Sequence, residues 1–408
     1  MAAASLATED EVRTEVRSWL ESNWIDEGRG ARWLAELVDA GWAAPSWPSR
    51  WCGRDLTPAL SRVVEQELAR AGAAGGGQDM VNLWAATVLS GGSDELKGEV
   101  LRPLLLGEIN MCLLYSEPGA GSDLAGLQTR AVRDGDEWIV NGQKVWTSSG
   151  RSADYGFLIA RTDWDVPKHR GITFFFAPMD QDGVEVRPLR QATGDSRFNE
   201  VFLTDARVPH ANILGDQNQG WMMLQTALAY ERSAMGQAGR RGRDQRAGAG
   251  VRTVDSDASA PVPDVSLIEL AQRTGASSDP TVRQGLTRLH ALTKVNEWNG
   301  MRAKAALEAG TSTPIVSLGK LAMSGILHSA ASLQAEILGA EAMLGGSDHP
   351  VAADTTYALL NAFFTSIGGG TDQIQRNIIG ERILGLPKEP EVDKDVPFRD
   401  VRTSIPGR

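Results

Sequence analysis

Tyr115-Ser-Glu-Pro-Gly-Ala-Gly-Ser-Asp123 and the nearby Asn141-Gly-Gln-Lys-Val-Trp-Thr-Ser148 are the most informative stretches of this chain. The first stretch is a glycine-punctuated loop that ends in small hydroxyl residues. The second brings a tryptophan beside further hydroxyls. Glycines let a planar ligand approach the backbone closely, and hydroxyls and amides supply neutral hydrogen bonds. This pairing suits a flavin ring.

The residues around these stretches predict a compact β domain. Asn141-Gly142 is a strong hairpin signal between expected strands at 137–140 and 144–148, because both positions tolerate positive φ. Further short strands, separated by turn residues, are expected at 157–160, 172–177, 184–188 and 200–203.

Helical patterns lie on both sides of the β domain. Thr8 and Glu11 form a capping-box pair ahead of a helix, and Thr57-Pro58 is a typical start for another. Residues 1 to about 109 are expected to be helical, with a glycine-rich break at 71–77. Helical spacing returns after Gln219 and continues to about Leu384, apart from residues 239–264, which lack apolar periodicity and predict a long exposed loop.

These patterns predict an α+β protein that is mainly α. A chain of 408 residues exceeds one ordinary core, so several packed parts are expected. The expected division is an N-terminal helical domain at 1–109, a middle β domain at 110–215 and a C-terminal helical domain at 216–408.

Composition excludes several classes of function. With 42% hydrophobic and 23% charged residues the chain is expected to be a soluble globular protein, and its net charge of −11 argues against general binding of nucleic acid. Cys52 and Cys112 are too few for a disulfide framework or a thiolate metal cluster, and the five histidines lack ligand spacing. No N-terminal signal pattern or apolar run of about 20 residues is present, so we expect a cytoplasmic protein without membrane insertion.

The quoted loop and strand, and the helical, β, helical order, resemble the acyl-CoA dehydrogenase family over almost the whole chain. The resemblance implies the acyl-CoA dehydrogenase fold, an FAD cofactor, an acyl-CoA substrate and a trans-2-enoyl-CoA product. It also implies an electron-transferring flavoprotein as electron acceptor and a homo- or hetero-tetrameric assembly. A flavin oxidase or monooxygenase on the same fold is the alternative enzyme.

The resemblance assigns cofactor-binding positions in both parts of the motif and near the C-terminus. Those for the flavin and acyl-CoA cradle are Tyr115, Ser116, Gly121 and Ser122, with Trp146 and Ser148 at the isoalloxazine ring and Thr371 and Gln373 at FAD. Ser122 is also expected to contact the coenzyme A arm. Each assignment has a simpler alternative: a lone tryptophan in a hairpin is often a core residue, and Thr371 could be an ordinary helix N-cap.

Dehydrogenation of a thioester needs a carboxylate base in an apolar setting, because burial raises the pKa of the carboxyl group toward the working pH. Glu231 interrupts an apolar helical stripe that consists of Trp221, Leu224, Leu228 and Met235. The alternative for this glutamate is a solvated or ion-paired helix position. Arg232 matches a coenzyme-contacting arginine of the family, or forms an ion pair on the helix surface.

The family carries its base either on this helix or just before the Gly-Thr of a C-terminal glycine-rich turn. Here that turn reads Gly368-Gly-Gly-Thr-Asp-Gln373, and Gly369 stands at the second location. Glu231 is therefore the expected base. The Gly369 N–H, with a flavin ribityl hydroxyl, is expected to polarise the thioester carbonyl.

Two family motifs are altered. An Arg-x-x-Phe-Gly motif that reaches the FAD of a neighbouring subunit is missing, and the usual Gln-x-x-Gly-Gly reads Glu336-Ile-Leu-Gly-Ala340. Such departures are known from actinobacterial enzymes built from two different chains. The chain is therefore expected to form a homo-oligomer with divergent contacts or to pair with a sister chain, as a catalytic or a non-catalytic subunit with an incomplete flavin site.

Overall fold

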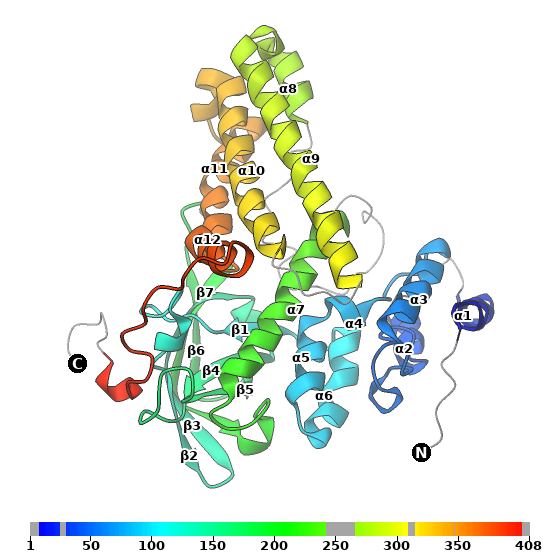
Figure 1. Ribbon diagram of the computed structural model, residues 1–408, viewed down its shortest axis with the longest axis vertical. Coiled ribbons are helices and arrows are strands. Elements are labelled where there is room, and N and C mark those ends of the chain that lie inside the picture. The colour runs from blue at the N-terminus through cyan, green and yellow to red at the C-terminus, as the bar shows by residue number, and fades with distance from the viewer. Residues whose placement is uncertain (1–7, 25–29, 242–265, 309–314, 347, 402–408) are drawn as a thin grey trace. The chain divides into compact units, whose positions relative to one another are not determined.

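The computed structural model describes residues 8–24, 30–241, 266–308, 315–346 and 348–401 (Figure 1). The chain divides into two compact units. The first unit comprises Met1–Arg190, Ser196–Ser256 and Val392–Arg408, and the second comprises Gln191–Asp195 and Asp257–Glu391. The division into three domains at 1–109, 110–215 and 216–408 stays a prediction.

The N-terminal part of the first unit is helical, as the sequence predicts. Its helices are α1 (Glu9–Asn23), α2 (Gly30–Asp39), α3 (Pro58–Arg70), α4 (Gln78–Val81), α5 (Leu83–Gly91) and α6 (Asp94–Leu106). The predicted capping box of α1 is confirmed, because Thr8 and Glu11 each accept a hydrogen bond from the other's backbone N–H. Thr57 caps α3, whose first residue is proline. The predicted break separates α3 from α4.

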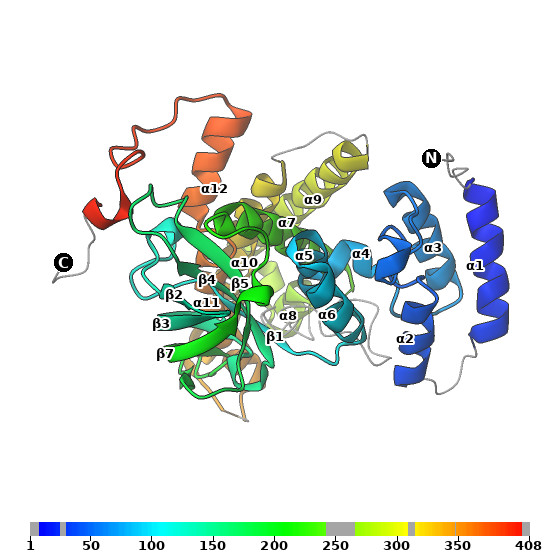
Figure 2. The ribbon, with the colours of Figure 1, turned by 90° about the horizontal axis from the view of Figure 1, so that it is seen from below.

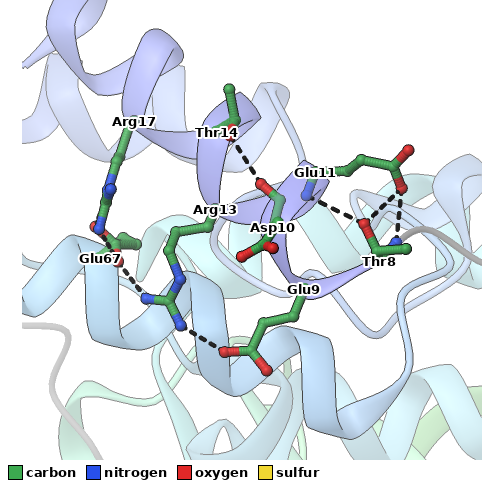
Figure 3. A network of polar contacts seen from close by, with 8 residues as sticks. All are labelled: Thr8, Glu9, Asp10, Glu11, Arg13, Thr14, Arg17 and Glu67. Atoms are coloured by element: carbon green, nitrogen blue, oxygen red, sulfur yellow. Dashed lines mark hydrogen bonds and ion pairs between the residues drawn. The ribbon is translucent and has the colours of Figure 1, made fainter.

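One buried glutamate fastens α1 to α3 (Figure 3). Arg17 donates from Nε and Nη2 to the two carboxylate oxygens of Glu67 at 2.7 and 2.9 Å, and Arg13 Nη1 donates to Oε1 at 2.5 Å. The hydrogen bonds from Arg17 lower the pKa of Glu67 from 4.5 to about 2, with help from Arg13 and against the effect of burial. Figures 1 and 2 both show α1 beside α3.

The β domain is one curved sheet. Its strands are β1 (Met111–Leu114), β2 (Arg130–Asp134), β3 (Glu137–Ser148), β4 (Tyr155–Arg161), β5 (Ile172–Pro178), β6 (Val184–Leu189) and β7 (Phe198–Pro209). The order is β1-β4-β2-β3-β7-β6, with β5 also paired to β4. Strands β4 to β7 confirm the predicted strands, whereas β1 and β2 had no separate prediction.

The hairpin predicted at Asn141-Gly142 is wrong. Strand β3 runs unbroken through both residues, and the turn between β2 and β3 lies at Gly135-Asp136. Gly135 has a φ of 62°, which suits the first central position of a two-residue turn, so it competes successfully with the later signal. Gly142 serves close packing instead, because a β-carbon there would lie 2.5 Å from Thr129 Oγ1.

Both faces of the central strands are covered. Phe157 and Phe174 lie in the core shared with the helices, whereas Leu158 and Phe175 point into a second core on the other face. Helix α7 (Gly220–Arg241) packs against β5, α4 and α5. It begins where the sequence predicts and continues to Arg241, past the expected start of the loop at 239; residues 242–264 of that loop lie outside the described residues.

The second unit is a helical bundle. Its helices are α8 (Leu267–Thr274), α9 (Pro280–Glu308), α10 (Ile315–Leu338), α11 (Pro350–Ile367) and α12 (Asp372–Ile378), and a π-helical turn follows at Ile379–Ile383. Helix α10 lies against both α9 and α11 (Figure 1). The return of helical structure to about Leu384 is therefore confirmed.

Candidate active site

The glycine loop that follows β1 contains a tight turn. Glu117 N–H donates to Ala120 O at 2.9 Å, and Ala120 N–H donates to Glu117 O at 3.1 Å. Pro118 takes the second position of this four-residue turn, which its restricted φ favours. The loop is joined to β3 where Val145 N–H donates to Ser116 O at 2.9 Å. The two stretches that dominate the sequence are thus neighbours in space.

A buried ion pair locks the loop to β3. Lys144 has no exposed side-chain surface, and its Nζ lies 2.8 Å from Glu117 Oε1 and 3.1 Å from Tyr115 O. The backbone N–H groups of Gln128 and Thr129 donate to the same carboxylate at 2.7 and 2.9 Å. Burial opposes ionisation of Glu117, but Lys144 and these donors outweigh it and hold its pKa below the usual value.

Glu117 and Lys144 lie within the two quoted stretches, but neither was among the predicted site residues. Lys144 precedes apolar strand residues, and Glu117 lies in a glycine-rich loop; a buried charge in either setting needs a partner. Because the two charges are opposite, their presence in two such stretches was the signal from which a buried ion pair could have been predicted.

Trp146 departs from ordinary strand geometry. It lies at a register shift between β3 and β7, its φ is 63°, and it is 58% exposed. Positive φ is unfavourable for a bulky residue, and bulges commonly redirect a side chain beside a functional site. The ring makes an edge contact with Phe198 at a centroid distance of 6.0 Å. The alternative that Trp146 is a core residue is wrong.

The remaining predicted cofactor residues of the first unit differ in exposure. Tyr115 is buried against Phe174, at a ring centroid distance of 5.9 Å. Ser116 and Ser148 are half-buried, whereas Gly121 and Ser122 are exposed. A β-carbon placed on Gly121 would meet no heavy atom within 4 Å, so the loop backbone is open to a ligand on that side.

Helix α7 carries the predicted base. Leu224 is fully buried, and Trp221 and Leu228 are half-buried, so the expected apolar stripe faces the core. Tyr230 OH lies 3.2 Å from Ser90 Oγ and so joins α7 to α5. The backbone of Glu231 and Arg232 belongs to α7, but their side chains, and that of Met235, lie outside the described residues.

The glycine-rich turn belongs to the second unit and brings Gly369, Thr371 and Gln373 close together in sequence and space. Gly369 and Gly370 have φ values of 65° and 86°. Thr371 is the N-cap of α12, since its Oγ1 accepts a hydrogen bond from Ile374 N–H at 3.2 Å, and Gln373 is exposed. The capping function of Thr371 is therefore present, and its proposed contact with FAD stays a prediction.

In the described part of the chain, no group of three or more His, Cys, Asp or Glu side chains is placed to hold a metal ion. Nor does any helix among those residues combine the length and apolarity needed to cross a bilayer.

Comparison with known proteins identifies the family. Models of the N-terminal, middle and C-terminal domains of acyl-CoA dehydrogenase match residues 2–108, 112–206 and 266–384. The acyl-CoA dehydrogenase IpdE1 of Mycobacterium tuberculosis is 33% identical over 93% of this chain and 98% of its own length. This chain belongs to the acyl-CoA dehydrogenase family.

Two solved structures extend the likeness to the fold of the whole chain. The Tcur3481-Tcur3483 steroid ACAD matches with a TM-score of 0.68 and 26% identity, over 95% of this chain and 100% of the other. The ChsE4-ChsE5 complex from Mycobacterium tuberculosis matches with a TM-score of 0.62 and 29% identity, with the same two coverages. The predicted α+β, mainly α, acyl-CoA dehydrogenase fold is confirmed.

Membership of the family also confirms the predicted activity. The chain is an oxidoreductase, an acyl-CoA dehydrogenase that forms an α,β double bond in an acyl-CoA thioester. Members of this family generally use FAD.

Proposed function

We propose that this acyl-CoA dehydrogenase holds FAD against the loop at 115–123 and the bulged end of β3. The main support for the proposal is the conformation of Trp146: its ring is exposed, and its backbone has a φ of 63°. Such a conformation costs about 1–3 kcal/mol and persists only where the surrounding fold maintains it. An exposed aromatic ring beside an open glycine loop suits a flat conjugated ligand.

The neighbouring groups fit a flavin. Gly121 and Ser122 leave backbone and hydroxyl groups accessible, and Ser148 lies two residues beyond Trp146 on the same strand. The buried ion pair between Glu117 and Lys144 holds the loop and strand in register, so these donors are fixed before a ligand arrives. When bound, FAD supplies the acceptor for the hydride that leaves the β-carbon.

Glu231 is our candidate for the base that removes the α-proton. The helical period places position 231 seven residues after the fully buried Leu224 and three after Leu228, on the same side of α7 as these two residues. A base of this kind needs an apolar setting, because loss of water raises the pKa of a carboxyl group and makes it a stronger base. Arg232, the next residue, is our candidate contact to the coenzyme.

The glycine-rich turn supplies the other part of the proposal. Gly369 is exposed, and its N–H makes no hydrogen bond to another backbone group within the described residues. We infer that this N–H polarises the thioester carbonyl and stabilises the negative charge that develops as the α-proton leaves. Thr371 and Gln373 are our candidate contacts to FAD in the second unit.

Replacing Glu231 tests the proposal. Glu231→Gln is expected to keep bound flavin but to lower turnover of an acyl-CoA panel, and exchange of the α-proton with solvent, by about 10²–10⁴-fold. Glu99→Gln, on the exposed surface of α6, is the matched control and should behave as wild type. Unchanged turnover in Glu231→Gln would remove this residue from the mechanism.

A second chain is our proposed partner. Both solved structures described above are named as pairs of chains, and the FAD-contacting motifs at Arg-x-x-Phe-Gly and 336–340 are altered here. We infer that this chain completes its flavin site with a different acyl-CoA dehydrogenase chain. Expressed alone it should carry clearly less than one flavin per chain. A fully loaded homo-oligomer would contradict this inference.

The substrate and acceptor follow from the same comparison. Since one neighbour is named a steroid ACAD, a bulky polycyclic acyl group is our proposed substrate class, and an electron-transferring flavoprotein is the proposed acceptor. Anaerobic bleaching of the flavin by straight-chain, branched and steroid side-chain thioesters ranks the substrates. Rapid oxygen consumption by the reduced enzyme would count against the flavoprotein acceptor.

A further inference from the structure

A buried amide lies directly against the glycine-rich turn. Gln375 Nε2 donates a hydrogen bond to Gly369 O at 3.1 Å, and the Gln375 side chain is only 4% exposed. A β-carbon on Gly370 would lie 3.0 Å from the same nitrogen. The amide therefore packs tightly beneath the turn and holds the peptide that joins Gly369 to Gly370.

This hydrogen bond restricts a flexible segment. Gly369 and Gly370 both adopt positive φ, and glycine reaches many other conformations at little cost. A peptide whose carbonyl is held cannot rotate freely. The Gly369 N–H belongs to the preceding peptide, 368–369, which lies between this held peptide and the one held by the hydrogen bond from Gly368 N–H to Phe364 O at 2.7 Å. Its rotation is therefore restricted from both sides. The Gly369 N–H, which makes no backbone hydrogen bond within the described residues, is thus held in one direction by the two fixed peptides that flank its own.

The helix that carries Gln375 is itself anchored. Asp372, at the start of α12, accepts hydrogen bonds from Lys320 Nζ at 3.1 Å and Ser324 Oγ at 2.8 Å, both on α10. Ser324 Oγ also lies 2.8 Å from Ser366 Oγ, which is 2.8 Å from His328 Nε2. With α12 fixed to α10 in this way, the Gln375 amide is a firm support for the turn.

We propose that Gln375 is a positioning residue: its amide holds the 369–370 peptide, which restricts the adjoining 368–369 peptide so that the Gly369 N–H meets the thioester carbonyl, and so sets how strongly that carbonyl is polarised. This inference rests on the proposed role of Gly369. It adds a residue that touches neither substrate nor cofactor. Its effect should therefore depend on the presence of the carbonyl oxygen in the ligand.

The test compares two coenzyme A ligands on the flavin-loaded enzyme: the enoyl-CoA product of the best substrate in the acyl-CoA panel, and an S-alkyl-CoA thioether of the same chain length. Only the first has a carbonyl. Wild type should bind the thioester more tightly. In Gln375→Met this preference should fall about fivefold, as for one lost hydrogen bond, and kcat should fall at least about tenfold, as for a misplaced oxyanion donor.

A merely structural role would weaken both ligands equally and leave the preference intact. Gln375→Glu keeps the shape of the side chain but loses the donor, so it gives the same reading if the methionine variant does not fold. Asn377→Ala, exposed on the same helix, is the control. A wild-type enzyme that carries its flavin and oxidises no thioester refutes the proposed function. A wild type that does, with unchanged preference in both Gln375 variants, refutes the inference about Gln375 alone.

Discussion

The glycine loop of the first unit and the glycine-rich turn of the second unit both expose backbone to a ligand, but they are supported differently. The loop is held by Lys144 and Glu117, whose side chains are 0% and 8% exposed. The turn is held by the neutral amide of Gln375 and, through α12, by Lys320 and Asp372, which are 22% and 17% exposed.

This difference has an energetic meaning. Two charges withdrawn from water depend on each other, since either one alone would be buried without compensation. A neutral amide bond, or an ion pair that still touches solvent, costs much less to break. We therefore expect that loss of either charge of the ion pair disrupts the loop as a whole. Variants that weaken the support of the turn should change catalysis more than folding.

The largest expected effect comes from Lys144→Met. This change leaves Glu117 buried without its cation, so the free energy of unfolding should fall by about 3–5 kcal/mol. Urea unfolding followed by tryptophan fluorescence measures it. The double variant Glu117→Gln/Lys144→Met removes both charges and should recover part of the loss. An equal loss in the single and double variants would show that the charges are not coupled.

Glu67→Gln tests an ion pair of intermediate burial. The variant weakens the hydrogen bonds that Arg13 and Arg17 donate to this side chain, so the free energy of unfolding at neutral pH should fall by about 1.5–3 kcal/mol. The folded pKa of about 2 lies below the ordinary 4.5, so the contribution is complete above pH 4.5 and is lost as the pH falls toward 2. The gap between variant and wild type should close over that window. A gap independent of pH would rule out ionisation as its cause.

Ser324→Ala weakens the support of α12 in the second unit. Because Asp372 keeps its hydrogen bond from Lys320, the free energy of unfolding should fall by only about 1 kcal/mol. Thermal unfolding of the holoenzyme measures this. Ser332→Ala, on the exposed side of the same helix, is the matched control. A loss as large as that of Lys144→Met would erase the contrast between the two regions.

Trp146→Gly should have the smallest effect on stability. Glycine relieves the strain at φ 63° but adds chain entropy to the unfolded state, so the free energy of unfolding should change by less than about 1 kcal/mol. Because the aromatic contact with the flavin is lost, flavin affinity should fall by up to about tenfold, as measured by fluorescence titration of the apoprotein. Large destabilisation with unchanged flavin affinity would mark Trp146 as a structural residue.

Local signals in the sequence predicted much of the fold. The caps at Thr8 and Thr57 and the start of α7 near Gly220 were predicted correctly, because each depends on residues within a few positions. The hairpin at Asn141-Gly142 was wrong because two turn signals lie close together, and strand pairing rather than local preference chose Gly135-Asp136.

In the candidate site, too, some features could be predicted from the sequence and others depend on the fold. Trp146 and Ser122 stood out by motif, but the exposure and positive φ of Trp146 arise from the bulge between β3 and β7. Sequence spacing could not assign a partner to Lys144 or Gln375. Lys144 pairs with Glu117, 27 residues away, and the bond from Gln375 depends on the conformation of a glycine turn.

The family of this protein, the order of its helical and β segments, and a short set of candidate residues could be predicted from the amino-acid sequence, because these depend on side-chain type and on contacts between near neighbours. Which charges lose their water, and which glycine peptide is held in place, depends on the folded structure. Desolvation and close packing exist only when distant segments meet, and no local pattern contains them.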